Sequence, residues 1–254
     1  MSWKAAGVSV IGSSHIRIGK PCQDSHAIQA LENGCLIGIV ADGLGSAERS
    51  EVGSNLAVQN AMAMLVAGLT VGIPECDNDW QSLLTKAFTE ARGALEAEAS
   101  HLQCELRELG TTLICFVVAN GEIAIGQIGD GAIVAQFTDD TLVTLSSPQR
   151  GEFANETVPL TMEKALERVR YHVRPAQIKN LAAFSDGLQN LALINTTYEP
   201  FEPFFSPLFE FLSGNSDRVQ MEEKLSAFLG SEKICGRTDD DKTLLLAAPL
   251  FDAA

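Results

Sequence analysis

The sequence predicts an α+β fold, a four-layer α-β-β-α sandwich with two central antiparallel sheets flanked by helices. Short apolar runs separated by turn residues indicate strands joined as hairpins. The segments with helical periodicity follow one another instead of alternating with strands, which disfavours a parallel sheet. Several strands are apolar on both faces and must be covered on both sides, as in stacked sheets. No linker or internal repeat interrupts the sequence, so we expect one domain over residues 1–254.

The first part of the chain begins with strands and then changes to helices. We expect strands at 6–11, 27–31 and 35–41, the last two joined at Glu32-Asn33-Gly34. From about Ser50, apolar residues recur at three- and four-residue steps, which predicts a helix with the stripe Val58, Ala61, Met62, Leu65 and Leu69. A second segment of this kind, from about Trp80 to Leu109, predicts a long helix that ends at Gly110.

The chain then returns to strands. In order, they are expected at 111–119, 122–128, 132–137, 141–145, 169–173, 181–185 and 243–248. Asn120-Gly121 and Asp139-Asp140 would turn the first two hairpins of this series. Two shorter helices are expected at about 207–212 and 221–229, with a polar irregular segment at about 146–161.

Composition excludes several classes of protein. Apolar residues make up 46% of 254 residues, enough for a substantial core. The formal net charge of −15 makes nucleic acid a poor partner, because an acidic surface repels phosphate. The beginning of the sequence lacks a signal peptide, and its most apolar segment, 61–73, is too short for a membrane span and predicts a buried helix. We expect a cytoplasmic protein that does not enter the membrane.

The six cysteines are Cys22, Cys35, Cys76, Cys104, Cys115 and Cys235, and they form no C-x-x-C pair. Neither cysteine nor histidine shows the spacing of zinc ligands. Several of these cysteines lie in apolar runs, so we interpret them as buried, reduced structural thiols.

Short acidic motifs spread along the chain carry the chemistry. Asp42, Asp130 and Asp186 each lie at the end of an apolar, strand-like run and directly before a glycine. Strand ends of this kind can deliver several carboxylates to one site. Two unit charges ~4 Å apart repel by roughly 4 kcal/mol at an effective dielectric near 20, so a cation must offset them. A divalent metal ion is the simplest candidate.

A fourth acidic motif is the run Asp239-Asp240-Asp241 near the C-terminal end. Side chains alternate along a strand, so Asp240 would point to one face and its two neighbours to the other. An ordinary acidic surface turn is an equally good interpretation of this run taken alone. Carboxylate oxygens without histidine or cysteine favour hard cations such as Mg2+ or Mn2+. A pair of such ions makes water nucleophilic enough to attack phosphorus.

In this order the motifs resemble the metal-dependent protein phosphatase family, protein phosphatase 2C. The matching segments are Gln23-Asp24-Ser25, Ala41-Asp42-Gly43-Leu44-Gly45, Gly110-Thr111-Thr112, Ile128-Gly129-Asp130, Ser185-Asp186-Gly187 and Asp240-Asp241-Lys242-Thr243. Each motif is short, but six in the family's order are specific. The sequence is most similar to a bacterial subgroup, through Gly12-Ser13-Ser14-His15 and Pro21-Cys22-Gln23-Asp24.

The resemblance implies two bound Mn2+ or Mg2+ ions, possibly with a third. The metal ligands that it implies are Asp42, Gly43, Asp130, Asp186 and Asp240. Asp42 would bridge both ions, and Gly43 would contribute its carbonyl oxygen. Asp130 with Asp186 would hold the third ion. Asp24, catalytic together with Asp42, would orient metal-bound water.

The sequence departs from the family pattern at three positions. Gly19 stands where many members have a phosphate-binding arginine, so His15, Arg17 or Lys20 is expected to bind substrate phosphate instead. His15 can equally be an ordinary polar residue near a strand end. Leu44 replaces the histidine proposed as general acid in eukaryotic members, and the arginine that follows the aspartate matched by Asp130 is absent. The segment 151–157 takes the place of the family's flap, as a substrate-facing loop or a simple surface loop.

The sequence therefore predicts a metal-dependent serine/threonine protein phosphatase in which water attacks phosphorus directly. No Cys-x5-Arg motif, the mark of a phosphocysteine mechanism, is present. The expected partners are a phosphorylated protein and a cognate kinase, and the expected state is a monomer. One alternative is a catalytically weak, metal-binding regulatory or scaffold domain of the same fold, and another is a phosphatase for small molecules. The sequence does not identify the substrate or choose between Mn2+ and Mg2+.

Overall fold

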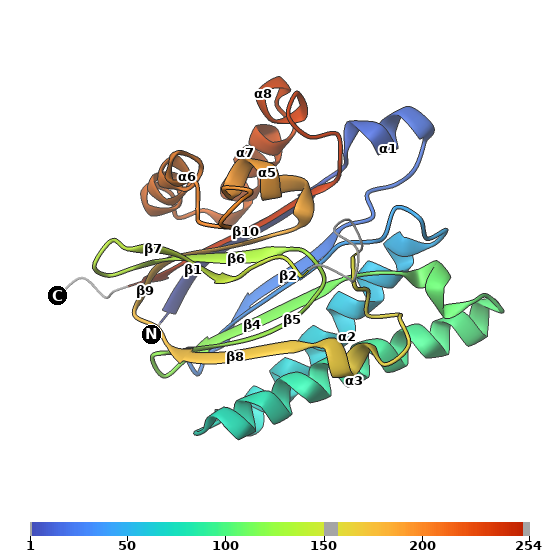
Figure 1. Cartoon of the computed structure of the whole chain (residues 1–254). Helices are drawn as coiled ribbons and strands as arrows, with labels where there is room; N and C mark the ends of the chain where they lie inside the picture. Colours follow the sequence, from blue (N-terminus) through green and yellow to red (C-terminus); the bar gives the residue numbers. More distant parts are fainter. Residues whose placement is uncertain (1, 150–156, 251–254) are drawn as a thin grey trace.

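The structure is a computed structural model that describes residues 2–149 and 157–250. Two five-stranded antiparallel sheets are stacked, with helices on both outer faces (Figure 1), which confirms the predicted sandwich. The first sheet has the order β1 (Ser2–Val10), β10 (Lys242–Leu250), β9 (Ile178–Phe184), β6 (Ala132–Phe137) and β7 (Leu142–Ser146). The second has the order β2 (Ser25–Ala30), β3 (Leu36–Ala41), β4 (Leu113–Ala119), β5 (Glu122–Ile128) and β8 (Arg170–Pro175).

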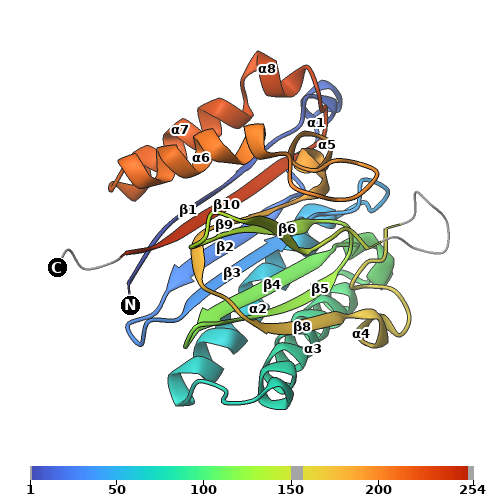
Figure 2. The same ribbon diagram turned by 60° about the vertical axis from the view of Figure 1, so that its left-hand side comes forward.

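Helices cover the two outer faces, as the views in Figure 1 and Figure 2 show. The second sheet carries α2 (Ser50–Val71) and α3 (Asp77–Leu102). The first sheet carries α5 (Gln189–Ala192), α6 (Glu202–Gly214), α7 (Arg218–Leu229) and α8 (Glu232–Cys235). The remaining short elements are α1 (Ser13–Ile18), α4 (Ala165–Arg168) and the 3-10 turns η1 (Leu106–Leu109) and η2 (Asp186–Leu188).

Three apolar layers lie between these elements. One is formed by the inner faces of the two sheets, with Phe116, Ile125 and Leu245 among its buried residues. The second lies under α2 and α3, and the third under α5, α6 and α7. Strands such as β3 and β4 are buried along their whole length because both of their faces meet one of these layers. This is the physical reason for their continuous apolar runs.

Several helices differ from the sequence-based expectation: α4, α5 and α8 were not predicted, and α6 is longer than the expected 207–212. The long helix α3 ends at Leu102, where Gln103 adopts the left-handed conformation with φ 53°, and Gly110 does not terminate it. The residues before Gly110 form η1 instead. The helix α1 was not predicted, because its sequence, Ser13 to Ile18, has no apolar stripe and exposes Ile16 and Ile18.

The expectation that no segment is long and apolar enough for a membrane span was wrong for α2. By length and composition alone, Ser50–Val71 meets that criterion. In the fold its buried face, with Ala57, Ala61 and Leu65, belongs to the apolar layer between the helices and the second sheet. The predicted helix over part of this segment is confirmed, but it is buried on one face only, because Ala63, Ala67 and Val71 are exposed.

The cysteines are all free thiols, as predicted. Cys35 and Cys115 are buried in the layer under α2 and α3. Cys76 is exposed, however, so the expectation of buried thiols does not hold for every one of them. Burial raises the pKa of Cys35, which keeps that thiol protonated and unreactive.

Substitution of Phe88 in α3 tests the layer beneath the helices. Its ring is fully buried and makes an edge-to-face contact with Tyr171 of β8, with ring centroids 6.2 Å apart. Phe88→Ala is expected to lower the free energy of unfolding by about 3–5 kcal/mol, since it removes a large ring and leaves a cavity. Urea denaturation followed by circular dichroism measures this change.

The matched control is Val71→Ala at the end of α2, where the valine side chain is 92% exposed. This change should alter the free energy of unfolding by less than about 0.5 kcal/mol. A loss for Phe88→Ala as small as that of the control would contradict the described packing of α3.

Candidate active site

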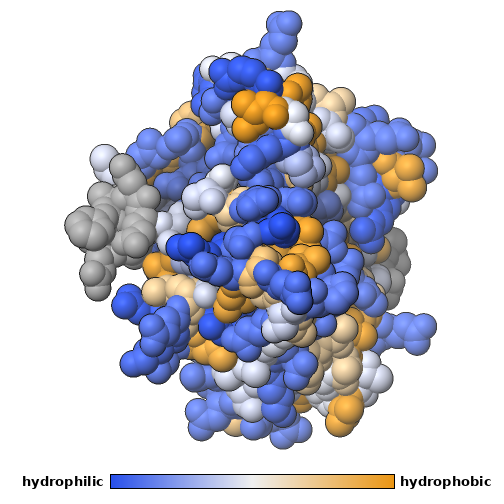
Figure 3. Space-filling view, turned by 90° about the vertical axis from the view of Figure 1, so that its right-hand side faces the viewer, coloured by the Kyte–Doolittle hydropathy of each residue, from blue (hydrophilic) through white to orange (hydrophobic). Residues whose placement is uncertain are grey.

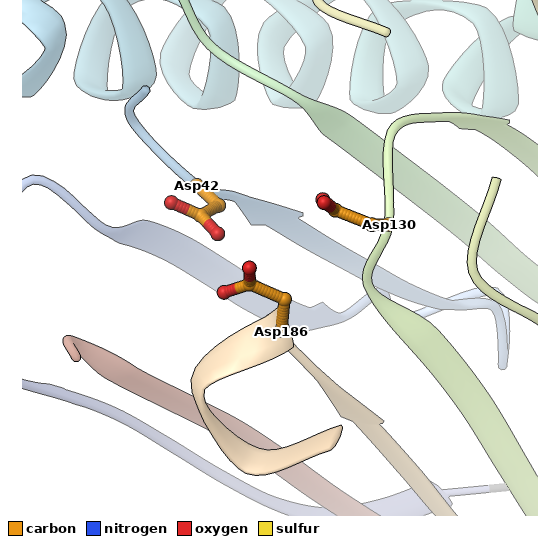
Figure 4. Close-up of side chains that lie close together, drawn as sticks. All are labelled: Asp42, Asp130 and Asp186. Atoms are coloured by element: carbon orange, nitrogen blue, oxygen red, sulfur yellow. The ribbon is translucent and has the colours of Figure 1, made fainter. Parts of the chain in front are cut away.

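Three carboxylates that are far apart in sequence meet at one end of the sandwich. Asp42 follows β3, Asp130 follows β5, and Asp186 begins η2 directly after β9 and Ser185. One carboxylate oxygen from each lies within 4.8 Å of the others. Figure 4 shows Asp42 and Asp186 facing each other, with Asp130 directed at the gap between them. The strands of both sheets therefore deliver acids to one shared space, as the sequence suggested.

The Thr111-Thr112 pair holds the backbone of Asp42. The Thr112 hydroxyl accepts a hydrogen bond from the Asp42 amide at 2.9 Å, and the Thr112 amide donates to the Asp42 carbonyl at 2.8 Å. The Thr111 hydroxyl donates to the same carbonyl at 3.1 Å. The Gly110-Thr111-Thr112 motif thus fixes the strand end from which the Asp42 side chain projects.

The glycines after the acids allow close approach of backbones. A Cβ atom at Gly43 would lie 2.6 Å from the carbonyl oxygen of Gln23, and one at Gly187 would lie 1.9 Å from that of Asp241. Neither contact is possible for a side chain, so both positions require glycine. The close approach of Gly187 to the start of β10 brings the Asp186 turn against the Asp239-Asp240-Asp241 run.

Asp130 is held by a threonine that lies beyond the gap in the described chain. The Thr157 hydroxyl donates to Asp130 Oδ2 at 2.5 Å, and Asp130 Oδ1 is buried without a partner among the described residues. The segment 151–157, expected as a flap or a surface loop, lies outside the described residues except for Thr157.

Asp24 is buried, and its charge acts on Asp42. Its Oδ2 atom accepts hydrogen bonds from the Ser185 hydroxyl at 2.7 Å and the Thr243 hydroxyl at 2.8 Å. Its Oδ1 atom has no partner within residues 2–149 and 157–250. One oxygen is therefore anchored to the fold, while the other remains available to a ligand.

The three aspartates of this run lie before β10 rather than on it, so strand alternation does not describe them: Asp241 is buried, whereas Asp239 and Asp240 are both exposed. Asp241 Oδ1 accepts from the Gly12 amide at 2.6 Å, and its Oδ2 accepts from the Gln23 amide at 2.5 Å. Asp240 is exposed, and its charge is one cause of the raised pKa values of Asp130 and Asp186. It therefore lies near the acidic cluster without belonging to the three-residue group.

The three residues expected to bind phosphate occupy different positions around α1. His15 is buried, and its Nδ1 atom lies 2.9 Å from Asp241 Oδ2. This ring nitrogen therefore makes a structural contact. The Arg17 guanidinium is 70% exposed and 3.6 Å from the Asp239 carboxylate. The Lys20 ammonium donates to the Gly45 carbonyl at 3.1 Å and so lies over the loop that follows Asp42. Gly19, with φ 71°, ends α1 in the left-handed conformation.

Burial and mutual repulsion raise the pKa values of the clustered acids. Burial is the largest cause for each, and it raises the pKa of Asp24 to about 7 and that of Asp186 to about 6. The pKa of Asp42 rises well above its usual value through burial and then the charges of Asp186 and Asp24. The pKa of Asp130 is also raised by burial, against the Thr157 hydrogen bond, which lowers it.

These observations fit a site for hard divalent cations. The described partners of the four acids are hydroxyl groups, backbone amides and one another, and none is a lysine or arginine. Two buried carboxylate oxygens, on Asp24 and Asp130, have no hydrogen-bond partner in the described chain. Oxygen ligands alone, with uncompensated negative charge, match the preference of Mn2+ and Mg2+.

Sequence reasoning assigned no role to four residues that support these acids. Ser185 and Thr243 anchor Asp24, Thr112 holds Asp42, and Thr157 holds Asp130. The first three lie inside motifs that the sequence analysis identified, so position in a motif was a usable signal. Thr157 belongs to an irregular segment with no pattern that would indicate its partner.

Comparison with known proteins agrees with this geometry. The sequence profile of protein phosphatase 2C matches residues 11–230. Serine/threonine-protein phosphatase 3 of Escherichia coli (strain K12) is 34% identical over 256 residues, covering 97% of this chain and 98% of that protein. The chain therefore belongs to the protein phosphatase 2C family, as the motifs predicted.

Two solved structures illustrate the shared fold. PppA, described as a key regulatory component of T6SS in Pseudomonas aeruginosa, has a TM-score of 0.68 at 18% identity, over 98% of this chain and 99% of that one. The catalytic domain of the phosphatase PstP, in complex with two manganese ions, has a TM-score of 0.63 at 19% identity, over 97% and 98%. The family assignment, together with the acidic cluster, makes this protein a metal-dependent serine/threonine phosphatase, a hydrolase.

The metal-free protein should lose stability with rising pH because of this cluster. The pKa values of Asp24, Asp42, Asp130 and Asp186 are raised in the fold, so between about pH 4 and 7 the folded state binds more protons than the unfolded state. Their contribution to the free energy of unfolding therefore falls as pH rises through this window. Thermal melts in EDTA and in excess Mn2+ from pH 5 to 8 measure it, and Mn2+ should stabilise most at high pH.

Other groups titrate in the same pH window, so the contribution of the cluster is isolated by comparing the wild type with Asp42→Asn. Burial lowers the pKa values of His26 and His172, and these histidines act with the opposite sign. The melting temperature of the variant minus that of the wild type, both without metal, is expected to increase with pH. A difference that is constant or decreasing would contradict the electrostatic description of the cluster.

Proposed function

We propose that this protein hydrolyses phosphoserine and phosphothreonine in a phosphorylated partner protein, by direct attack of water at a centre that holds two metal ions. The observation that carries the proposal is the convergence of Asp42, Asp130 and Asp186 within 4.8 Å in a chain of the protein phosphatase 2C family. A concentration of negative charge without described cationic partners is unfavourable unless metal binding offsets it.

Specific residues are proposed to hold the ions. Asp42 would be shared between two ions, with Asp186, Asp240 and the carbonyl of Gly43 completing their ligands. Asp130 would hold a third ion together with Asp186. When bound, such ions supply the Lewis acidity that makes water nucleophilic near neutral pH and neutralises phosphate charge.

Asp24 is proposed to orient the attacking water. Its Oδ2 atom is fixed by the Ser185 and Thr243 hydroxyls, so the carboxyl group cannot rotate freely. Its partnerless Oδ1 atom can then accept a hydrogen bond from that water. In the metal-free protein, burial raises the pKa of this carboxyl to about 7.

Lys20 is proposed to bind the substrate phosphate in place of the missing arginine. Its ammonium group lies at the loop after Asp42, through its contact with Gly45, and the residue is half-buried. Arg17 and His15 remain candidates for the same task, although Arg17 faces Asp239 and His15 Nδ1 faces Asp241. A lysine ammonium attracts phosphate as a point charge rather than through paired hydrogen bonds.

The rest of the proposal concerns the setting of this activity. The formal charge of −15 favours a basic phosphorylated segment in the partner protein. A cognate kinase, a monomeric state and a cytoplasmic location remain part of the proposal. The face of the molecule at which α1 lies is mainly hydrophilic with smaller apolar patches (Figure 3), as suits contact with a polar peptide.

The alternative of an inactive scaffold is not favoured. The acids expected from the family motifs are present, and three of them form a compact group. Turnover of p-nitrophenyl phosphate with Mn2+ would exclude the scaffold, and faster turnover of a phosphopeptide than of nucleotides would exclude a small-molecule phosphatase.

Asp42→Asn tests the central assignment. The change removes the negative charge that two ions would share, so kcat for a phosphothreonine peptide is expected to fall at least about a hundredfold. The fold should persist, because the backbone of Asp42, rather than its side chain, bonds Thr111 and Thr112. Phosphate release measures kcat, and circular dichroism checks the fold. Undiminished turnover would refute the site.

Lys20→Met tests phosphate recognition. Methionine keeps most of the side-chain length and removes the charge, so KM for the phosphopeptide is expected to rise about threefold to tenfold. Lys86→Met, on the exposed side of α3, is the matched control and should leave KM unchanged. If Lys20→Met behaves like the control while Arg17→Met raises KM, phosphate recognition belongs to Arg17.

A further inference from the structure

A chain of hydrogen bonds links Asp24 to a histidine at the edge of the sandwich. The Thr243 hydroxyl donates to Asp24 Oδ2 at 2.8 Å. The Thr243 and Ser9 hydroxyls are 2.6 Å apart, and the Ser9 hydroxyl is 2.8 Å from Nδ1 of His26. β1, β2 and β10 each contribute one member, because β1 pairs with β10 and also contacts β2. The motif roles derived above include neither Ser9 nor His26.

Each hydroxyl has one proton, so the direction of the whole chain is determined by its ends. If Thr243 donates to Asp24, then Thr243 must accept from Ser9, and Ser9 must accept from the Nδ1–H of His26. If Nδ1 lacks a proton and accepts from Ser9, every bond reverses, and the proton between Thr243 and Asp24 must belong to Asp24. The presence of a proton on His26 Nδ1 and the ionisation of Asp24 are therefore linked by the geometry of the chain.

The environment of His26 is compatible with both arrangements. The imidazole is half-buried and has a backbone hydrogen bond with Gly7 in addition to its contact with Ser9. Glu222 and Arg218 of α7 are the charged groups that act on it from outside the chain of hydroxyls, with opposite signs. Glu222 also accepts from the Gly7 amide at 3.4 Å and from Arg218 at 2.8 Å, which fixes this edge.

We propose that His26 is a positioning residue for Asp24, which acts through Ser9 and Thr243 to orient the catalytic carboxyl and to exchange a proton with it. This inference rests on the proposed function, because it takes the catalytic role of Asp24 as given. It adds a path for proton transfer between the buried site and the edge of the sheets.

The proton transfer balances without any other reactant. Asp24 Oδ2–H gives its proton to Thr243 Oγ1, whose own proton moves to Ser9 Oγ, whose proton moves to His26 Nδ1. Asp24 becomes a carboxylate and His26 an imidazolium, while both hydroxyls keep one proton each. The imidazolium then returns its proton to solvent. Asp24 thus regains its charge without releasing a proton from Oδ1 to the water that it orients.

Kinetic variants at the far end of the chain test the proposal without changing a metal ligand. Ser9→Ala breaks the chain and is expected to lower kcat about fivefold at unchanged KM, the worth of one net hydrogen bond. Ser9→Thr restores a hydroxyl and should restore kcat. His26→Asn can donate to Ser9 but cannot take up a proton, so it should remove one ionisation from the pH profile of kcat. His172→Asn, on β8, is the matched control.

A kcat and a pH profile equal to those of the wild type in both Ser9→Ala and His26→Asn would overturn the proposal. So would an equal loss in Ser9→Thr and Ser9→Ala, because a structural defect would then explain both. Circular dichroism and thermal melts confirm that each variant is folded.

A second measurement separates failure of this inference from failure of the proposed function. In the metal-free protein, 15N chemical shifts of the His26 ring report its tautomer and its titration. Asp24→Asn removes the anion at the far end and is expected to lower the pKa of His26, and Ser9→Ala should largely abolish that effect. If the wild type hydrolyses no phosphopeptide, the proposed function is wrong. The linkage between Asp24 and His26 is tested separately, by the change in the pKa of His26. If the pKa of His26 is the same in Asp24→Asn as in the wild type, the proposed linkage is wrong.

Discussion

Repulsion among carboxylates gathered at one end of the sandwich is the constraint on which the rest of the structure depends. Asp42, Asp130 and Asp186 lie on three different strand ends, and neither sheet alone carries all three. Their approach is unfavourable in the absence of a cation. Rigid surroundings must therefore hold them in place, and the apolar layers on both sides of each sheet supply that rigidity.

Hydroxyl groups hold the acids at the correct positions without neutralising them. Ser185 and Thr243 fix Asp24, Thr157 holds Asp130, and Thr112 fixes the backbone of Asp42. A lysine or arginine in these places would pair with the acids and weaken their attraction for a metal ion. Neutral donors orient a carboxylate and leave its charge available. The link from Asp24 through Thr243 and Ser9 to His26 extends the same device to the edge of the sheets.

Asp241 has a structural task, although it lies between a proposed ligand and the buried Lys242. Its two oxygens bind the Gly12 and Gln23 amides and the His15 ring, and so attach α1 and the Asp24 loop to the start of β10. Asp240, by contrast, is exposed, and its charge acts on Asp130 and Asp186. The run therefore combines a proposed metal ligand, Asp240, with an acid that holds the fold together, Asp241, and a sequence pattern alone cannot distinguish such roles.

The sequence by itself determined the layers of the fold, most strands and the acids of the site, because apolar periodicity and the strand-aspartate-glycine motifs are local signals. It missed the short helices α1, α4, α5 and α8, placed the end of α3 at Gly110 instead of Leu102, and gave no role to Ser9, His26 or Thr157. Only the tertiary structure decided these points. A left-handed residue such as Gln103, or a hydroxyl that reaches an acid more than two hundred residues away, depends on which strands become neighbours. The spacing of residues along the chain does not show which strands will become neighbours.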